Sequence, residues 1–236
     1  MRVITLTIDG HELSGTDEET VLDVARAHGI HIPTMCQLDG LPEWGGCRLC
    51  LVEVQGSSKL QAACVSRVAE GMVVNTQSPK LLAYRQTITE MLFSEGNHVC
   101  SVCVSNGHCE LQTMAQELKI DHVSLPYRYP ERHVDASHKY FVFDPNRCIL
   151  CTRCVRVCDD VEGAHTWDVS GRGIDSKLIT DLNTPWGESQ TCTNCGKCVQ
   201  ACPTGALFEK GTTPGEMEKS PDFLHYLQNM REQKND

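Results

Sequence analysis

Apolar and polar residues alternate at the start of the chain with the two-residue period of a β-strand. Aliphatic side chains and threonine alternate over residues 3–8, and the Asp9-Gly10 pair that follows favours a hairpin turn. Residues 11–14 can supply the returning strand. The sequence therefore predicts that a β-hairpin opens the fold.

A helix is predicted after the hairpin because apolar residues recur there at helical spacing. Thr20 can cap a helix whose apolar face is formed by Val21, Val24 and Ala25, and Gly29 lies where a helix commonly ends. Strand-like stretches at 51–54 and 72–76 flank a cysteine-containing loop rich in glycine. Together these elements predict a small α+β unit that ends near Ser78-Pro79.

The middle of the chain predicts two more helices and an irregular stretch. Pro79 suits the first turn of a helix, and apolar residues recur at roughly helical spacing up to the Gly96-Asn97 break. A shorter helix is expected over 110–118. Residues 121–137 show little periodicity, which is typical of a linker and equally of an ordered surface loop.

The last part of the chain has two separate features. Segments 148–158 and 192–202 both read C-x2-C-x2-C-x3-C, an internal repeat with a hairpin expected between them around 171–173. An amphipathic stretch at 223–230 follows two prolines. It can form a docking helix or a frayed terminus.

Composition changes the picture because the core is lean and cysteine is abundant. Of 236 residues 40% are hydrophobic and 6% aromatic, whereas fifteen are cysteine. An odd number of cysteines in tight clusters is typical of metal ligands in a reducing compartment. No run of eighteen apolar residues and no signal-peptide pattern occurs, so we expect a cytoplasmic protein with no transmembrane segment.

The charge of the chain disfavours polyanionic partners. Thirty-one acidic residues oppose 21 basic ones, which gives a formal net charge of -10. Because nucleic acids and anionic membrane surfaces repel such a chain, neither is expected as its main partner.

The repeated cysteine run has a known chemistry. Two-cluster ferredoxins bind their [4Fe-4S] clusters with this spacing, and the fourth cysteine of each run ligates the other cluster. The expected ligand sets are Cys148, Cys151, Cys154 with Cys202, and Cys192, Cys195, Cys198 with Cys158. Pro203 completes the second run, whereas Asp159 stands in the corresponding place of the first. The alternative is a pair of zinc sites, which would leave several cysteines unexplained.

A second group of four cysteines falls inside the predicted α+β unit. The group reads C-x10-C-x2-C-x13-C and resembles a variant of the plant-type [2Fe-2S] pattern, with a longer first gap. Gly45 and Gly46 would let backbone amides approach the sulfurs. Zinc is again the alternative. The expected ligands are Cys36, Cys47, Cys50 and Cys64.

The remaining three cysteines need a fourth ligand if they bind a [4Fe-4S] cluster. Cys100, Cys103 and Cys109 have the spacing C-x2-C-x5-C. His98 lies just before them and His108 adjoins Cys109, and a neutral imidazole can bind iron. We expect His98 to complete the site, with His108 as the alternative.

The order of these motifs resembles a known group of redox proteins. A variant [2Fe-2S] unit, a histidine-preceded three-cysteine motif that ends in Cys109-Glu110-Leu111-Gln112, and a two-cluster ferredoxin unit occur together in three families. These are the large iron-sulfur subunit of respiratory complex I (its amino-terminal part), the accessory domains of [FeFe] hydrogenases, and the small diaphorase subunit of bidirectional NAD(P)-reducing [NiFe] hydrogenases. The resemblance covers residues 1 to about 210. The first two continue well beyond this length, so the diaphorase subunit fits best.

The resemblance implies an α+β fold built from three cluster-binding domains. These are a β-grasp [2Fe-2S] ferredoxin domain over 1–78, a small helical [4Fe-4S] domain with one histidine and three cysteine ligands over 79–118, and a two-cluster bacterial-type ferredoxin domain over 139–210. A linker over 119–138 and a tail over 211–236 complete the chain. The larger relatives have three residues between the histidine and the first cysteine, whereas only Val99 separates His98 from Cys100 here.

The resemblance also implies cofactors, partners and a role. One [2Fe-2S] and three [4Fe-4S] clusters are expected on this chain, and FMN and NAD(P) on a partner. The implied partners are an NADH- and FMN-binding diaphorase subunit and the small and large hydrogenase subunits. Since no nucleotide-binding motif is found and no cysteines remain for a hydrogen-activating centre, the chain is expected to transfer electrons without an active site of its own. The alternatives are a subunit of complex I or of a formate dehydrogenase, or a free-standing carrier.

Overall fold

The first residues form the predicted hairpin. In the computed structural model, which describes residues 1–232 and the side chains of residues 1–227, β1 (Val3–Ile8) pairs antiparallel with β2 (His11–Thr16). The turn residues Asp9 and Gly10 both have positive φ, as a tight hairpin turn requires. Alternate residues of β1 point to one face and are buried there: Ile4, Leu6 and Ile8.

Three further strands extend the hairpin into a five-stranded sheet. They are β3 (Leu51–Val54), β4 (Gln61–Ala62) and β5 (Val73–Asn75), and the order across the sheet is β2-β1-β5-β3-β4. Strands β1 and β5 run parallel, with Ile8 opposite Val74. The other pairs are antiparallel. Strands distant in the sequence are thus neighbours in the sheet.

Helix α1 (Val21–Ala27) covers the buried face of this sheet. The Thr20 side chain accepts a hydrogen bond from the Asp23 amide at 3.2 Å, and the Asp23 carboxylate accepts one from the Thr20 amide at 2.9 Å, so the helix begins with a capping box. The apolar face predicted from the spacing is buried, together with one further leucine: Val21, Leu22, Val24 and Ala25.

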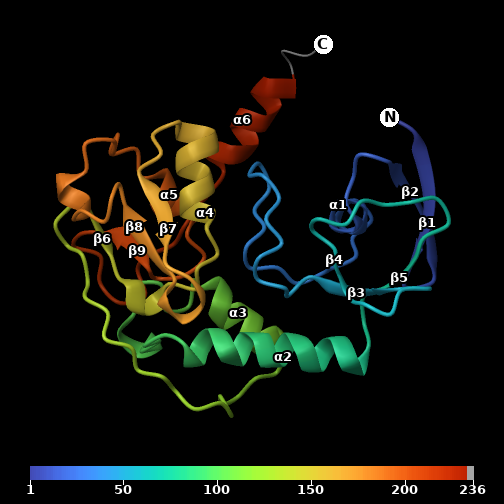
Figure 1. Cartoon of the computed structure of the whole chain (residues 1–236), viewed down its shortest axis with the longest axis horizontal. Coiled ribbons are helices and arrows are strands. Elements are labelled where there is room, and N and C mark those ends of the chain that lie inside the picture. Colours follow the sequence, from blue (N-terminus) through green and yellow to red (C-terminus); the bar gives the residue numbers. More distant parts are fainter. Residues whose placement is uncertain (233–236) are drawn as a thin grey trace.

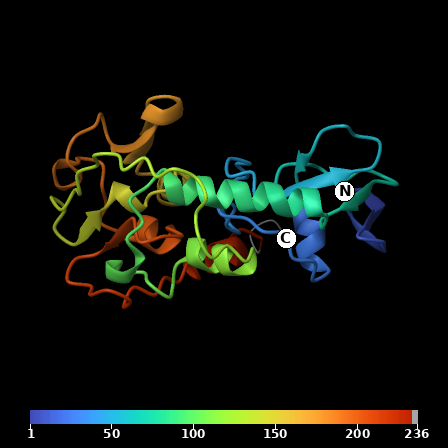
Figure 2. The same cartoon turned by 90° about the horizontal axis from the view of Figure 1, so that it is seen from below.

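Helix α2 (Pro79–Ser94) joins the sheet to the rest of the molecule. Ser78 caps the helix and Pro79 occupies its first turn. The helix runs from the lobe that contains the five-stranded sheet, called the sheet lobe below, to the opposite lobe, called the second lobe (Figures 1 and 2). The buried guanidinium of Arg85 donates hydrogen bonds to the carbonyls of Leu49 and Leu51, at 3.1 and 3.0 Å. These bonds fasten α2 to the sheet lobe.

The second lobe contains short elements, most of them separated by loops. The two-stranded sheets are β6 (Phe141–Phe143) with β9 (Leu207–Glu209) and β7 (Trp167–Ser170) with β8 (Lys177–Thr180), and the second of these is the hairpin expected around 171–173. The helices are α3 (Glu110–Glu117), α4 (Arg153–Arg156) and α5 (Lys197–Ala201). Single turns lie at Cys100–Val102, Pro145–Arg147, Gly173–Asp175 and Trp186–Glu188, and a π-helical turn at Val157–Glu162.

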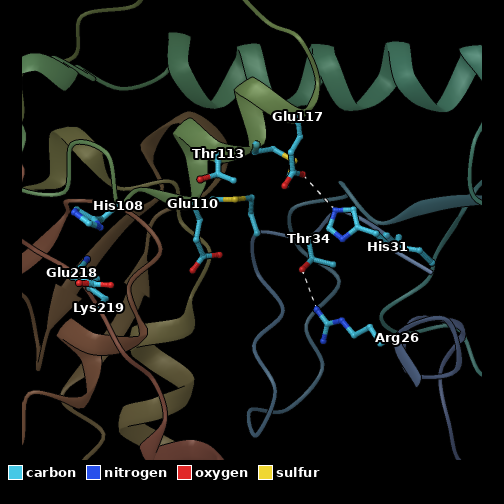
Figure 3. A pocket seen from close by; sticks show the side chains of 12 residues that line it. Arg26, His31, Thr34, His108, Glu110, Thr113, Glu117, Glu218 and Lys219 are labelled. Carbon is cyan, nitrogen blue, oxygen red and sulfur yellow. Dashed lines mark hydrogen bonds and ion pairs between the residues drawn. The ribbon is translucent and has the colours of Figure 1, made fainter. Parts of the chain in front are cut away.

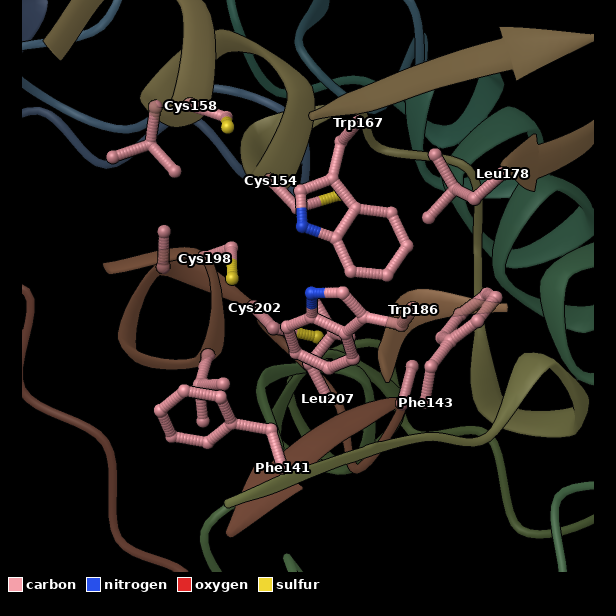
Figure 4. Close-up of a cluster of buried hydrophobic side chains, with 14 of the residues drawn as sticks. Phe141, Phe143, Cys154, Cys158, Trp167, Leu178, Trp186, Cys198, Cys202 and Leu207 are labelled. Carbon is pink, nitrogen blue, oxygen red and sulfur yellow. The ribbon is translucent and has the colours of Figure 1, made fainter. Parts of the chain in front are cut away.

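Two tryptophans occupy the centre of the second lobe. The indole rings of Trp167 and Trp186 are steeply inclined to each other, with their centroids 4.8 Å apart, and both are buried. Figure 4 shows four cysteine sulfurs around these indoles, from Cys154, Cys158, Cys198 and Cys202. The core of this lobe is therefore built in part from thiols rather than from hydrocarbon alone.

The irregular stretch between α3 and β6 is hydrogen-bonded along its length. Ser124 donates from its amide to the Glu90 carboxylate at 2.9 Å, and the Arg128 amide donates to the Ser94 carbonyl at 3.0 Å. Asp135 pairs with Phe143 and accepts from the Trp186 amide at 2.7 Å. These contacts describe an ordered surface loop. The limits expected for the domains and for the linker stay a prediction.

The chain after β9 folds back over the second lobe. The Gly215 amide donates to the Cys103 carbonyl at 3.1 Å, and the Met217 amide to the Val104 carbonyl at 2.9 Å. Helix α6 (Phe223–Glu232) follows, and its Leu224 is buried in the core of this lobe. The last four residues of the predicted tail lie outside the described residues. Within residues 1–232 no helix has the length and apolarity needed to cross a membrane.

Candidate metal centres

The two cysteine runs exchange their fourth cysteine in the folded chain. One cavity is lined by Cys148, Cys151, Cys154 and Cys202. Another is lined by Cys158, Cys192, Cys195 and Cys198. The structure thus brings together the two ligand sets expected from the sequence, each with one cysteine from the other run.

The loops of both runs turn in the same way. In the first run, Leu150 has a φ of 52° and Thr152 a φ of 59°. At the matching positions of the second run, Asn194 has a φ of 61° and Gly196 a φ of 72°. Two left-handed residues at matching positions wrap each loop around its cavity. The repeat in the sequence is therefore a repeat of backbone conformation.

The departure at Asp159 has a local structural counterpart. Pro203 directly follows α5 and its last cysteine, where a proline cannot continue a helix. Asp159 allows the chain after Cys158 to continue helically, and it does so as a π-helical turn. The Cys158 side chain still lines its cavity, so the departure removes no candidate ligand.

The third cavity joins His98 to the three remaining cysteines. The walls of this cavity include Cys100, Cys103 and Cys109 as well as His98. Arg147 also lines it. Three cavities, each lined by four donor side chains, fit three cofactors of one kind.

His98 has the environment of a neutral imidazole ligand. It is hydrogen-bonded to the Leu92 backbone, while its Nε2 is buried and has no hydrogen-bond partner among the described residues. Burial lowers the pKa of His98 to about 4, so the ring is neutral near pH 7 and keeps a free lone pair. A metal centre bound in the thiol-lined cavity would give the unpartnered Nε2 of His98 a partner.

His108 lies elsewhere. Its side chain is exposed and lines a different pocket, together with Glu218 and Lys219 (Figure 3). Of the two candidate histidines, the structure places only His98 at the three-cysteine cavity.

Glycines allow the walls of this cavity to approach closely. A Cβ on Gly96 would lie 2.6 Å from the His98 Nε2 and 2.6 Å from the Asn146 carbonyl oxygen, and a Cβ on Gly205 would overlap the Cys103 Sγ. No residue larger than glycine fits at these two positions without displacing a candidate ligand.

The fourth group of cysteines lies in the loop between α1 and β3 and just after β4. The Cys50 and Cys64 sulfurs are 3.3 Å apart, and the Cys47 amide donates to the Cys36 Sγ at 3.5 Å. Hydrogen bonds from the thiols of Cys47 and Cys64 lower the pKa of Cys36. All four sulfurs are therefore within reach of one small cofactor, arranged as two pairs.

Several thiols at the expected [4Fe-4S] sites resist ionisation by themselves. Burial raises the pKa of Cys148 to about 12 and that of Cys151 to about 11. A buried thiolate needs a positive counter-charge, which iron supplies. Among residues 1–227 no three His, Cys, Asp or Glu side chains converge closely enough to hold a single metal ion. The thiols instead surround cavities, which fits a multi-iron group.

Some residues at these sites gave no signal in the sequence. Arg147 lines the His98 cavity, and Lys219 donates to the Cys202 carbonyl at 3.0 Å and also bonds the Thr204 carbonyl. Neither belongs to a cysteine motif. Arg147 adjoins Cys148 but is one of many basic residues in the sequence, and Lys219 is seventeen residues from Cys202, which it approaches. Only the tertiary structure identifies them.

Three family models match successive parts of the chain. Residues 1–79 match the 2Fe-2S iron-sulfur cluster binding domain, residues 85–124 the NADH-ubiquinone oxidoreductase-G iron-sulfur binding region, and residues 140–208 the ferredoxin-like domain of NADH-quinone oxidoreductase subunit 3. The predicted α+β fold class with three cluster-binding units is confirmed. The chain is an iron-sulfur protein, and the zinc alternative receives no support.

Relatives of similar length identify the family. The chain is 36% identical over 208 residues to the NAD-reducing hydrogenase HoxS subunit gamma of Cupriavidus necator, a match that covers 88% of this chain and 87% of that one. A crystal structure of NAD+-reducing [NiFe]-hydrogenase in the H2-reduced state superimposes with a TM-score of 0.84 at 36% identity, over 89% and 88% of the two chains. The chain belongs to the family of the gamma subunit of NAD-reducing hydrogenase, and the predicted resemblance is confirmed.

Longer relatives share the same region. The NADP-reducing hydrogenase subunit HndD of Solidesulfovibrio fructosivorans is 36% identical over 219 residues, which are 89% of this chain and 36% of that protein. The chain is therefore an iron-sulfur subunit of an oxidoreductase, with electron transfer as its role.

Proposed function

We propose that the chain carries electrons between an NADH- and FMN-binding diaphorase subunit and the small and large subunits of a [NiFe] hydrogenase. Oxidation of H2 would then be coupled reversibly to reduction of NAD(P)+. Membership of the gamma-subunit family and likeness to the NAD+-reducing [NiFe]-hydrogenase structure support this proposal. A cytoplasmic location is part of it, since NAD(H) is a substrate of that compartment.

The observation that carries the proposal is that thiol-lined sites adjoin one another within one chain. Thr204 lines both the cavity of His98 and that of Cys148. Cys158 and Cys202 each come from one run and line the cavity of the other. Neighbouring sites that share walls are the arrangement that electron transfer between fixed centres requires.

The proposed contents are one [2Fe-2S] cluster and three [4Fe-4S] clusters. Each cluster, when bound, accepts and returns one electron. The ligand sets are those expected from the sequence: Cys36, Cys47, Cys50, Cys64; His98, Cys100, Cys103, Cys109; Cys148, Cys151, Cys154, Cys202; and Cys158, Cys192, Cys195, Cys198.

The protein's own residues would protect and orient these groups. The Leu150 amide donates to the Cys148 Sγ at 3.4 Å, the Thr166 amide to the Cys158 Sγ at 3.3 Å, and the Trp186 indole to the Cys192 Sγ at 3.4 Å. Such donors stabilise negative charge on sulfur and make reduction easier. The buried indoles also exclude water from one side of the Cys192 site.

Hydride and hydrogen chemistry would take place on partner subunits, which hold the FMN, NAD(P) and nickel-iron centres. We propose no catalytic residue on this chain. It would be a non-catalytic part of a hydrogen:NAD(P)+ oxidoreductase, because a cluster moves electrons but forms no covalent bond with substrate.

The test is an anaerobic reduction experiment on the iron-loaded full chain, followed by EPR. NADH and H2 are added to the chain alone, to the chain with its co-purified diaphorase subunit, and to the chain with its hydrogenase subunits. We expect NADH to reduce the clusters only with the first partner and H2 only with the second. Reduction of the rigorously pure chain by either substrate contradicts the non-catalytic role, and failure of H2 with the hydrogenase subunits contradicts the proposed partnership.

A further inference from the structure

One arginine bridges the ligand loops of two different candidate centres. Arg156, on α4, donates from Nη1 to the Pro42 carbonyl at 2.6 Å and from Nη2 to the Cys36 carbonyl at 2.5 Å. The same Nη2 lies 3.3 Å from the Cys151 carbonyl. Cys36 belongs to the four-cysteine site of the sheet lobe and Cys151 to a cavity of the second lobe. A single guanidinium therefore contacts both.

Its neighbour on the same helix makes a different kind of contact. Arg153 binds both carboxylate oxygens of Glu110, at 2.5 and 2.8 Å, and donates to the Gln37 carbonyl at 3.0 Å. The charge of Arg153 is thus balanced by a carboxylate. Figure 1 shows α4 beside the loop that follows α1, and the carbonyls of that loop that the two arginines contact belong to Cys36, Gln37 and Pro42.

The charge of Arg156 has no such balance. Arg156 is 6% exposed, and its hydrogen-bond acceptors among the described residues are backbone carbonyls rather than carboxylates. Its Nε is buried and has no partner among those residues. A buried cation with an unused donor requires nearby negative charge. Burial and the neighbouring Arg153 cation lower the pKa of Arg156, whereas the negative charges that favour its protonated form are the sulfurs of Cys151, Cys36 and Cys154.

We propose that Arg156 is a positioning residue for electron transfer, which holds the Cys36 loop against the Cys151 loop and raises the reduction potentials of the groups bound at both sites. This inference rests on the ligand sets proposed above. The buried charge of Arg156 is the counter-charge of two centres at once.

The direction of the effect follows from charge. Reduction of the iron-sulfur group at either site would add one electron and no proton, so the group together with its four thiolate ligands would become more negative by one. A fixed cation in a low-dielectric interior lowers the energy of that more negative state and thereby raises the potential. Because the guanidinium contacts both loops, both potentials rise, and the driving force between the two sites changes less than either potential.

A purely structural role of Arg156 would give a different result. If Arg156 only joined the lobes, a variant that retained both clusters would retain their potentials, whatever its thermal stability. Measurement of the two reduction potentials therefore distinguishes the two roles of Arg156, whereas activity and thermal stability do not.

The experiment is an EPR-monitored redox titration of the iron-loaded full chain and three variants. Arg156→Gln removes the charge, Arg156→Lys keeps it on a shorter donor, and Arg172→Gln removes an equal charge from the exposed turn between β7 and β8. In Arg156→Gln we expect the reduced-to-oxidised ratio of both sites to fall about tenfold at the wild-type midpoint, a shift of about 59 mV for one electron. Arg156→Lys should remain close to wild type, and Arg172→Gln unchanged.

Each outcome decides the inference. Unshifted potentials in a fully loaded Arg156→Gln protein overturn it, and so does an Arg156→Lys protein whose two potentials fall as far as those expected for Arg156→Gln. The lysine variant decides the matter alone if the glutamine variant fails to assemble. A wild-type chain without iron and labile sulfide would instead contradict the proposed function. The failures of the two proposals are thus distinguishable.

Discussion

Gly205 lies directly against Cys103, so that a methyl group on Gly205 would overlap the cysteine sulfur. The contact joins the segment after α5 to the three-cysteine motif, about one hundred residues earlier in the chain. Its geometry explains why the two sites can share a wall at Thr204.

Gly205→Ala should displace Cys103 and weaken the site of His98. The backbone of Gly205 is outside the left-handed region, so alanine causes no backbone strain there. The displacement of Cys103 would come from the overlap with the added Cβ alone. Overpacking of this kind typically costs about 1–3 kcal/mol. We expect about four fewer irons per chain, the content of one cubane, and a lower melting temperature. Gly10→Asn, in the open turn of the β1–β2 hairpin, is the control, and a Gly205→Ala protein with full iron content would show that the site can relax.

His98→Ala should make one cluster labile and leave the other three intact. The variant removes the orphaned Nε2 donor, and we expect loss of one iron or of the whole cluster from that site, measured by EPR and iron analysis. His98→Cys should retain the cluster, but at a lower potential, because a thiolate adds one negative charge.

The matched control for this prediction is His108→Ala. The His108 side chain lines the pocket shown in Figure 3 and not the cavity of the three cysteines, so its removal should leave the spectrum unchanged. The assignment is wrong if His108→Ala disturbs the cluster while His98→Ala does not.

The purified chain should contain about fourteen irons, two from one [2Fe-2S] and twelve from three [4Fe-4S] clusters. Acid-labile sulfide should be present at about the same stoichiometry, and zinc nearly absent. Elemental analysis of anaerobically isolated protein measures both. Stoichiometric zinc with little sulfide would contradict the iron-sulfur content proposed for all four sites.

Removal of iron should unfold the second lobe before the first. The core of the sheet lobe includes two cysteines, Cys50 and Cys64, and its β1–β2 ladder spans six residue pairs. The core of the second lobe includes four cysteines and is framed by two-stranded sheets. After chelation, hydrogen exchange should be fast at β6 and β9 and still slow at β1. Equal loss of protection in both lobes would contradict this order.

Local elements were predictable because their signals lie within a few residues. The hairpin turn at Asp9-Gly10, the Thr20 cap and the start of α2 at Pro79 follow from turn and capping chemistry, which depends on adjacent residues. The strand bounds 51–54 agree with β3. The three-residue strands β6 and β9 were missed, since a strand of that length is too short to show a periodic pattern.

The candidate sites were predictable to the extent that cysteine spacing encodes them. Spacing predicted which cysteines meet at each cavity, and the exchange of Cys158 and Cys202 followed from the known pattern of two-cluster ferredoxins. Spacing could not choose between His98 and His108, because each lies within two residues of a cysteine. The parallel pairing of β1 with β5 and the reach of Arg156 to Cys36 depend on long-range packing that no local pattern records.

The exchange of Cys158 and Cys202 between the two ferredoxin-like cavities imposes an order on biosynthesis. Three cysteines of the first cavity leave the ribosome roughly fifty residues before Cys202, which is about 2–10 s earlier at ~5–20 residues per second. During that interval the nascent chain presents an incomplete thiol set, open to oxidation or to the wrong metal. Residues 215–219, which contact the backbone of Cys103 and Cys202, emerge later still. Iron-sulfur delivery is therefore timed best to a chain that has already been synthesised past Lys219.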